Sequence, residues 1–157
     1  MNIDSNKNPI SLLAPFSGQL IPLEEVGDGV FSAKLLGDGI AIEPTGSAVC
    51  APADGQVINV FPTGHAYVIN TREGLSLLIH VGLDSVQLRG EGFRVLVEAG
   101  DTVKAGQRIA EVDLERMRSL GLRTVSMCVV CEGGEGLSMA AATGAVEAGR
   151  DIVLTLG

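Results

Sequence analysis

Glycine, proline and aspartate interrupt this chain so often that its apolar runs stay short. The sequence has 157 residues with 21 Gly and 6 Pro, and 46% of its residues are apolar. Short apolar runs between such turn-forming residues are typical of β-strands joined by tight turns. They predict strands at Gln19–Leu23, Gly39–Glu43, Gly55–Phe61, His65–Asn70, Leu75–Val81, Phe93–Val97, Arg108–Val112, Thr124–Val130 and Asp151–Thr155. So many strands in a chain of this length, without a long linker, indicate a single all-β domain.

Helical signals are confined to two short segments. The segment Asp113–Leu120 begins with a residue type that caps helix N-termini, and Gly121 after it suits a C-terminal stop. A further short turn is predicted at Ser32–Leu36, which Gly37 ends. We therefore expect one or two short helices in an otherwise β structure.

A weak internal repeat narrows the architecture. The turn entering the strand at Ala51–Val57 has an echo in Val97–Gln107, which has the same turn chemistry. Such turns are typical of barrel-sandwich hybrid folds, so we expect an antiparallel β-sandwich or barrel of that type over residues 10–157. Residues 1–9 are polar and predict a flexible N-terminal tail.

Charge and hydropathy exclude several kinds of partner. Lys and Arg number 11 against 19 Asp and Glu, a net charge of -8. An acidic surface argues against binding nucleic acid or anionic lipid and favours partners with basic contact surfaces. No segment reaches the roughly 18 consecutive apolar residues that span a bilayer, and the polar start carries no apolar signal region. We expect a cytoplasmic protein without membrane insertion.

The cysteines predict no disulfide framework, because their number is odd. Cys128 and Cys131 form a CxxC, but they fall in a predicted strand, where residues three apart face opposite sides. We interpret them as ordinary strand cysteines.

The two histidines of the chain are the candidate reactive residues. If Thr71–Gly74 forms a four-residue loop, Asn70 pairs with Leu75, and His65 lies directly opposite His80 in an antiparallel pair. The Cβ atoms would then be about 4.5–5.5 Å apart on one face of the sheet. A three-residue loop would instead point the two rings to opposite faces.

Two neighbouring imidazoles can carry several kinds of chemistry. In the favoured register Tyr67 and Ile69 share their face, so the pair would lie in a mostly apolar patch open to solvent. Neutral imidazole can attack phosphorus near pH 7, and a backbone carbonyl that holds the proton on the other ring nitrogen would fix the tautomer. The alternatives are two packed structural histidines, or a metal site that lacks a third ligand.

The segments around these histidines resemble one family. Phe61–Ala66 resembles the F-x-T-x-H-A segment of the glucose-class enzyme IIA proteins, and Leu77–Val86 is similar to their phosphorylation-site motif. Further segments match in unbroken order: Val30–Phe31, Gly37–Ile42, Ala51–Gly55 and Gly90–Phe93. The chain is thus identified as a member of this family, the phosphocarriers of the bacterial phosphoenolpyruvate:sugar phosphotransferase system.

The resemblance implies a role for each matching residue. His80 would be phosphorylated through Nε2, and His65 would bond the phosphoryl oxygens. Thr63 would orient His65, and the Gly82 carbonyl would accept the Nδ1 proton of His80. The resemblance also implies a docking surface with an acidic rim and an apolar patch, formed by Asp28, Asp84, Val30, Phe31, Leu35, Leu36, Phe61, Ile79 and Val86. No cofactor or metal is required, although the two histidines could ligate zinc in a complex.

The implied partners are the small carrier HPr, as phosphoryl donor, and the cysteine of an enzyme IIB domain of a sugar permease, as acceptor. An alternative is a regulatory binding protein that senses sugar transport through the same phosphorylatable site. A lysostaphin-like zinc peptidase needs H-x-x-x-D and H-x-H motifs, which residues 65–69 and 80–82 do not provide. Lys104 lacks the setting of a biotin or lipoate attachment site. The chain departs from the family pattern at Ser85, usually Thr, and over residues 128–142.

Overall fold

The structure is a computed structural model that describes residues 9–157. The predicted tail over residues 1–9 therefore lies, apart from Pro9, outside the described residues. The strands are β1 (Ile10–Leu13), β2 (Gly18–Pro22), β3 (Asp38–Pro44), β4 (Ala48–Cys50), β5 (Gly55–Val60), β6 (Ala66–Thr71), β7 (Ser76–His80), β8 (Phe93–Val95), β9 (Thr102–Val103), β10 (Arg108–Val112), β11 (Ser126–Glu132), β12 (Met139–Ala141), β13 (Ala145–Val146) and β14 (Ile152–Leu156). The helices are α1 (Leu114–Ser119) and two short 3-10 turns, η2 (Leu23–Glu25) and η3 (Ser85–Leu88).

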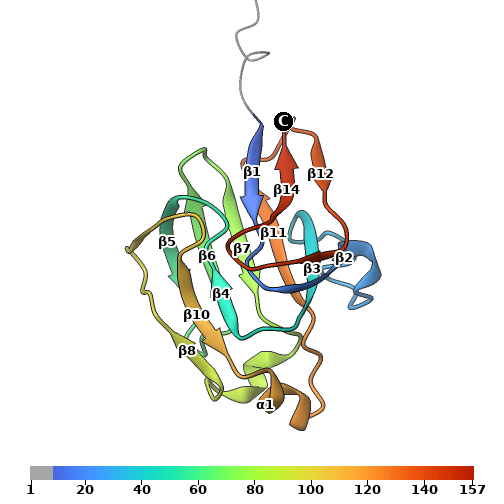
Figure 1. The fold of residues 1–157 in the computed structure, drawn as a ribbon, viewed down its shortest axis with the longest axis vertical. Coiled ribbons are helices and arrows are strands. Elements are labelled where there is room, and N and C mark those ends of the chain that lie inside the picture. Colours follow the sequence, from blue (N-terminus) through green and yellow to red (C-terminus); the bar gives the residue numbers. More distant parts are fainter. Residues whose placement is uncertain (1–8) are drawn as a thin grey trace, which may run out of the picture.

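The strands form three antiparallel sheets (Figure 1). The largest has the order β13-β2-β3-β11-β7-β6-β5-β9, and the smaller ones are β1-β14-β12 and β4-β10-β8. This arrangement confirms the predicted all-β antiparallel architecture. All the predicted strands are present close to their expected bounds, whereas β1, β4, β9, β12 and β13 were not predicted because each is short or follows a Gly- or Pro-rich turn.

Two apolar clusters lie on opposite faces of the large sheet. Leu77 and Ile79 of β7 belong to the larger cluster, whereas Leu78 between them belongs to the smaller one. The smaller cluster also includes Leu23 and Phe31, from the segment that follows β2. Because side chains alternate along a strand, His80 at the end of β7 points to the face of the smaller cluster.

The short helix agrees with its predicted signals. The Asp113 carboxylate accepts a hydrogen bond from the backbone N–H of Arg116, 3.1 Å away, and so caps the N-terminus of α1. Gly121 has a φ of 74°, which ends the helix in a left-handed residue. Met117 on the inner face is fully buried in the larger cluster. Within residues 9–157 no helix is long and apolar enough to cross a membrane.

The predicted register of the β6–β7 hairpin is wrong by one residue. Asn70 pairs with Ser76 rather than Leu75, and Ala66 rather than His65 lies opposite His80. The cause is Thr71, which stays in the strand: its N–H donates to the Leu75 carbonyl, and its hydroxyl accepts from the Leu75 N–H.

The loop is therefore three residues long, and the faces of β6 are reversed relative to the prediction. Tyr67 and Ile69 are fully buried in the larger cluster. Ala66 and Val68 lie instead on the outer face that carries His80.

Both cysteines of the CxxC lie in β11, as predicted. Cys128 is fully buried in the larger cluster, whereas Cys131 is exposed, and both thiols are free. Burial raises the pKa of Cys128 to about 12, so this thiol stays protonated at neutral pH.

Candidate active site

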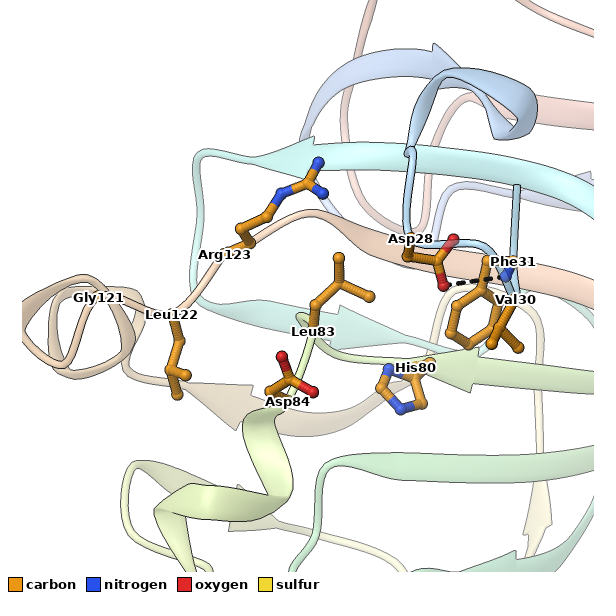
Figure 2. A pocket seen from close by; sticks show the side chains of 9 residues that line it. All are labelled: Asp28, Val30, Phe31, His80, Leu83, Asp84, Gly121, Leu122 and Arg123. Carbon is orange, nitrogen blue, oxygen red and sulfur yellow. Dashed lines mark hydrogen bonds between the residues drawn. The ribbon is translucent and has the colours of Figure 1, made fainter. Parts of the chain in front are cut away.

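His80 lies at the end of β7, where the chain leaves the sheet beside a cleft of about 490 Å³. Figure 2 shows its ring between Asp84 on one side and Phe31 and Val30 on the other. The ring is partly buried, and the segment before β3 covers one side of it. The cleft is lined by Asp28, Val30, Phe31, His80, Leu83, Asp84, Gly121, Leu122 and Arg123.

A backbone carbonyl fixes which nitrogen of His80 carries the proton. The Nδ1 atom lies 2.8 Å from the carbonyl oxygen of Gly82, which can only accept, so Nδ1 is the donor. In the neutral ring this leaves the lone pair on Nε2. Gly82 makes this turn at a φ of 68°, in the left-handed region where residues with a side chain are strained.

His65 also lies in the site, but its position does not follow from the alternation of side chains along β6. It immediately precedes β6, after Gly64 with a φ of 76°, so its side chain is not bound to the pleat of the strand. Its carbonyl accepts from the Val81 N–H at 2.8 Å, which holds the residue beside the end of β7. The ring centroids of His65 and His80 are 5.2 Å apart with an interplanar angle of 79°. The expected proximity therefore exists, although the expected register does not.

Thr63 also lies where the sequence placed it. Its hydroxyl is hydrogen-bonded to Nδ1 of His65, and the two groups form one side of the site. The buried Tyr67 hydroxyl donates to the Gly64 carbonyl and braces the turn between them. Thr63 thus contacts the ring that it was expected to orient.

Both imidazoles are held neutral by their surroundings. Burial lowers the pKa of His65 below its ordinary value. Burial of the ring, and then the neighbouring His65, lower the pKa of His80 from 6.5 to about 4. The hydrogen bond to Gly82 and two nearby carboxylates oppose this shift without overcoming it. At neutral pH His80 is consequently an uncharged ring with a free Nε2.

Aromatic rings enclose the pair. Phe31 lies 5.1 Å from His80, and Phe61 lies 5.4 Å from His65 in an edge-on arrangement, both measured between ring centroids. Phe31 is buried and Phe61 is partly buried. They cover part of each histidine ring, which keeps water from those faces and lowers the local dielectric.

Two acidic side chains flank the cleft, as expected. The Asp28 carboxylate accepts from the backbone N–H groups of Phe31 and Ser32, at 3.0 and 2.9 Å. Burial alone raises the pKa of Asp28, but these donors outweigh it and hold the pKa below the ordinary value. Asp84 is exposed and adopts a left-handed conformation, with a φ of 57°, at the start of η3. Both positions leave carboxylate charge at the mouth of the site.

The expected apolar docking residues divide into three groups. Val30, Leu35, Leu36 and Val86 are exposed, with Leu35 at 70%. Phe31 and Phe61 pack against the histidines. Ile79 is a correction: it is fully buried in the larger cluster, because it alternates with His80 along β7 and points to the opposite face. Ile79 therefore packs on the opposite face of the sheet from His80 and offers no surface to a partner protein.

Two residues that the sequence analysis did not single out shape the loop after His80. The Ser126 hydroxyl accepts from the Gly82 N–H at 3.0 Å. The Arg123 carbonyl accepts from Leu83 N–H at 3.0 Å, and its guanidinium donates to the Val26 carbonyl at 2.8 Å. The bond of the Ser126 hydroxyl joins residues 44 apart in the sequence, and that of the Arg123 guanidinium joins residues 97 apart. No local spacing in the sequence could reveal such contacts.

His65 and His80 are the pair that the sequence analysis named as possible zinc ligands, and their rings lie together in the site. In the part of the chain that the structure describes, no group of three or more His, Cys, Asp or Glu is arranged to hold a metal ion. Any zinc bound by His65 and His80 would need a ligand from another molecule.

Comparison with known proteins assigns the family. A sequence profile described as phosphoenolpyruvate-dependent sugar phosphotransferase system, EIIA 1, matches residues 10–135. The chain belongs to this family. The match continues past residue 128, where the segment that departs from the family motifs begins. Strand β11, which overlaps the start of that segment, lies between β3 and β7 in the large sheet.

Relatives of this chain occur both alone and in larger proteins. The glucose-specific EIIA component of Haemophilus influenzae is 36% identical over 94% of this chain and 89% of its own length. The glucoside-specific EIICBA component of Staphylococcus carnosus is 41% identical over 91% of this chain, but over only 21% of its own length. This EIIA chain thus spans about a fifth of such longer relatives.

A solved structure shares the fold of this family member. The glucose permease IIA from Mycoplasma capricolum matches it with a TM-score of 0.86 and 35% sequence identity. The match covers 96% of this chain and 97% of the other. The chain therefore has the same β-sandwich architecture as this solved glucose permease IIA.

Proposed function

We propose that this chain is a phosphocarrier of sugar uptake, which accepts a phosphoryl group from phospho-HPr on His80 and passes it to the cysteine of an enzyme IIB domain. The observation that carries the proposal is the Nδ1 bond of His80 to the Gly82 carbonyl at 2.8 Å. It leaves Nε2 as the nucleophile in a ring that stays neutral at physiological pH. The family membership supplies the phosphoryl-transfer context.

In the first transfer, the Nε2 lone pair of His80 attacks phosphorus as the N–P bond of the donor phosphohistidine breaks. The bonding electrons stay on the donor imidazole, and the Nδ1 proton of His80 stays between the ring and Gly82. The positive charge that develops on the His80 ring is stabilised by that carbonyl and by the carboxylates of Asp28 and Asp84. No proton needs to leave the His80 ring during the step.

His65 would stabilise the transferred group. Its Nδ1 is engaged by Thr63, and when the Thr63 hydroxyl donates, the proton of the neutral His65 ring is on Nε2. With its ring 5.2 Å from that of His80, His65 can then donate to an oxygen of a phosphoryl group on His80. We therefore assign Thr63 the orienting role and His65 the phosphoryl-binding role.

In the second transfer, the cysteine thiolate of the enzyme IIB domain attacks phosphorus, and the P–N bond electrons return to Nε2 of His80. Both partners would approach the same face, since each must reach the cleft. Exposed Val30, Leu35, Leu36 and Val86 would form the apolar docking patch around it. The flanking carboxylates suit basic side chains on these partners.

The proposal also covers the domain and its location. We propose that residues 10–157 form one enzyme IIA domain and that this domain acts in the cytoplasm. The relatives named EIICBA support an enzyme IIB partner, because their names join the A and B components in one protein.

The test is phosphorylation with phosphoenolpyruvate, enzyme I and HPr, followed by transfer to an enzyme IIB domain. His80→Ala should abolish acceptance. His65→Gln should still accept, because the nucleophile remains, but should pass the phosphoryl group on poorly. Normal labelling of His80→Ala would refute the assignment.

A further inference from the structure

In the loop that orients His80, the backbone polar groups on both sides of Gly82 are hydrogen-bonded. The Gly82 carbonyl accepts from His80 Nδ1, and the N–H of the same peptide unit, from Leu83, donates to the Arg123 carbonyl at 3.0 Å. On the other side, the Gly82 N–H donates to the Ser126 hydroxyl at 3.0 Å. The direction of the carbonyl therefore depends on two contacts with the segment that enters β11.

Ser126 makes more specific contacts with this loop than a residue that only fills space would need. Its side chain has no exposed surface, and its hydroxyl both accepts from Gly82 and donates to the Thr124 carbonyl at 2.9 Å. That second bond aims the oxygen lone pairs at the Gly82 N–H. Glycine adopts the left-handed φ of 68° found at Gly82 without strain, so the contacts around Gly82 decide where its carbonyl points.

We propose that Ser126 is a positioning residue for phosphoryl transfer, which fixes the tautomer of His80 by holding Gly82 in place. This inference rests on the proposed function. Without the hydroxyl, the Gly82 N–H is buried without an acceptor, and the turn must shift to satisfy it. The carbonyl then moves away from Nδ1, and the His80 proton distributes between the two ring nitrogens. A ring with its proton on Nε2 has no lone pair on that atom to attack phosphorus.

The experiment compares Ser126→Ala with Thr71→Val. Thr71 is a matched control because its hydroxyl also accepts from a buried backbone N–H, that of Leu75, at the far end of the same hairpin. The ¹⁵N NMR shifts of His80 report the tautomer, and phosphorylation kinetics with phospho-HPr report kcat and KM. Ser126→Cys, which keeps the volume with a weak acceptor, serves as a second variant if the alanine variant does not fold.

We expect wild type and Thr71→Val to show His80 protonated on Nδ1. Ser126→Ala and Ser126→Cys should show a substantial Nε2-protonated fraction and about a tenfold lower kcat, the scale of one unsatisfied buried donor. KM should be unchanged because the docking patch is untouched. Both Ser126 variants retaining the wild-type tautomer and kcat, with no more than a loss of stability like that of Thr71→Val, would overturn the proposal.

The measurements distinguish a failure of the role of Ser126 from a failure of the proposed function. If the His80 tautomer shifts in the Ser126 variants while even the wild-type protein takes no phosphoryl group, the proposed function is wrong and Ser126 still positions His80. If wild type is phosphorylated on His80 and the Ser126 variants match it in tautomer and rate, only the role of Ser126 is wrong.

Discussion

The buried, neutral state of His80 must make the stability of the protein depend on pH. The pKa of His80 is lowered from 6.5 to about 4. Above pH 6.5 the ring is neutral in both the folded and the unfolded state and adds no pH dependence. As the pH falls from 6.5 towards 4, the unfolded chain binds the proton first, so the free energy of unfolding decreases. At ~1.4 kcal/mol for each pH unit between the two pKa values, the total loss is about 3 kcal/mol.

His80→Gln removes this contribution while keeping a polar side chain of similar size. Urea unfolding of wild type and variant at pH 7.5, 6.5, 5.5 and 4.5 gives the free energy of unfolding of each. Carboxylates also titrate in this range, but they do so in both proteins, so the difference between the two curves isolates His80. We expect wild type to lose most of about 3 kcal/mol relative to the variant across this range. Parallel curves would show that His80 is not held neutral by burial and would refute the reasoning.

Three further substitutions test the loops around the site. Gly82→Ala should lower the free energy of unfolding by about 1–3 kcal/mol, measured by urea titration, because φ is 68° and the new Cβ would lie 2.1 Å from Met117 Cε and 3.0 Å from the Arg123 carbonyl. Leu35→Glu, at a side chain that is 70% exposed, should leave stability within about 0.5 kcal/mol of wild type while raising KM for phospho-HPr; an unchanged KM would remove Leu35 from the docking patch. Arg123→Ala removes the bond to the Val26 carbonyl that ties down the loop before β3 and should raise the same KM with kcat retained; a fall in kcat alone would contradict that role.

The hairpin between β6 and β7 shows where sequence reasoning stops. Alternating apolar residues correctly predicted both strands and the outward side of β7. The pairing depended on whether Thr71 belongs to the loop or to the strand, and both readings suit a turn that ends in Gly74. The Thr71 hydroxyl decides it through its bond to the Leu75 N–H, a contact that no residue pattern encodes. An error of one residue then reversed the faces of β6.

His65 lies close to His80 although the predicted register was wrong, because its position does not depend on strand pairing. Gly64 lets His65 leave the pleat before β6 begins, so its ring turns to the outer face. The family motif contains the whole turn, including Thr63, so it implied the pair without any assumption about strand register. Contacts made across the fold, such as those of Ser126 and Arg123, carry no local signal and appear only in the folded structure.

The buried position of Ile79 has a simple physical origin. Adjacent residues of β7 face opposite sides, so a docking residue directly before His80 is excluded once His80 faces the cleft. The alternation of β7 was recognised in the sequence, and applying it to Ile79 would have removed this residue from the docking surface.

Nε2 of His80 is the atom proposed to carry the phosphoryl group. The most direct measurement is to phosphorylate the protein with phosphoenolpyruvate, enzyme I and HPr, locate the modified peptide by mass spectrometry, and identify the linkage by ³¹P and ¹⁵N NMR. We expect one phosphoryl group per chain, on the peptide that contains His80 and bonded to Nε2, with Nδ1 still protonated towards Gly82. A phosphoryl group on His65, or one bonded to Nδ1 of His80, would contradict it.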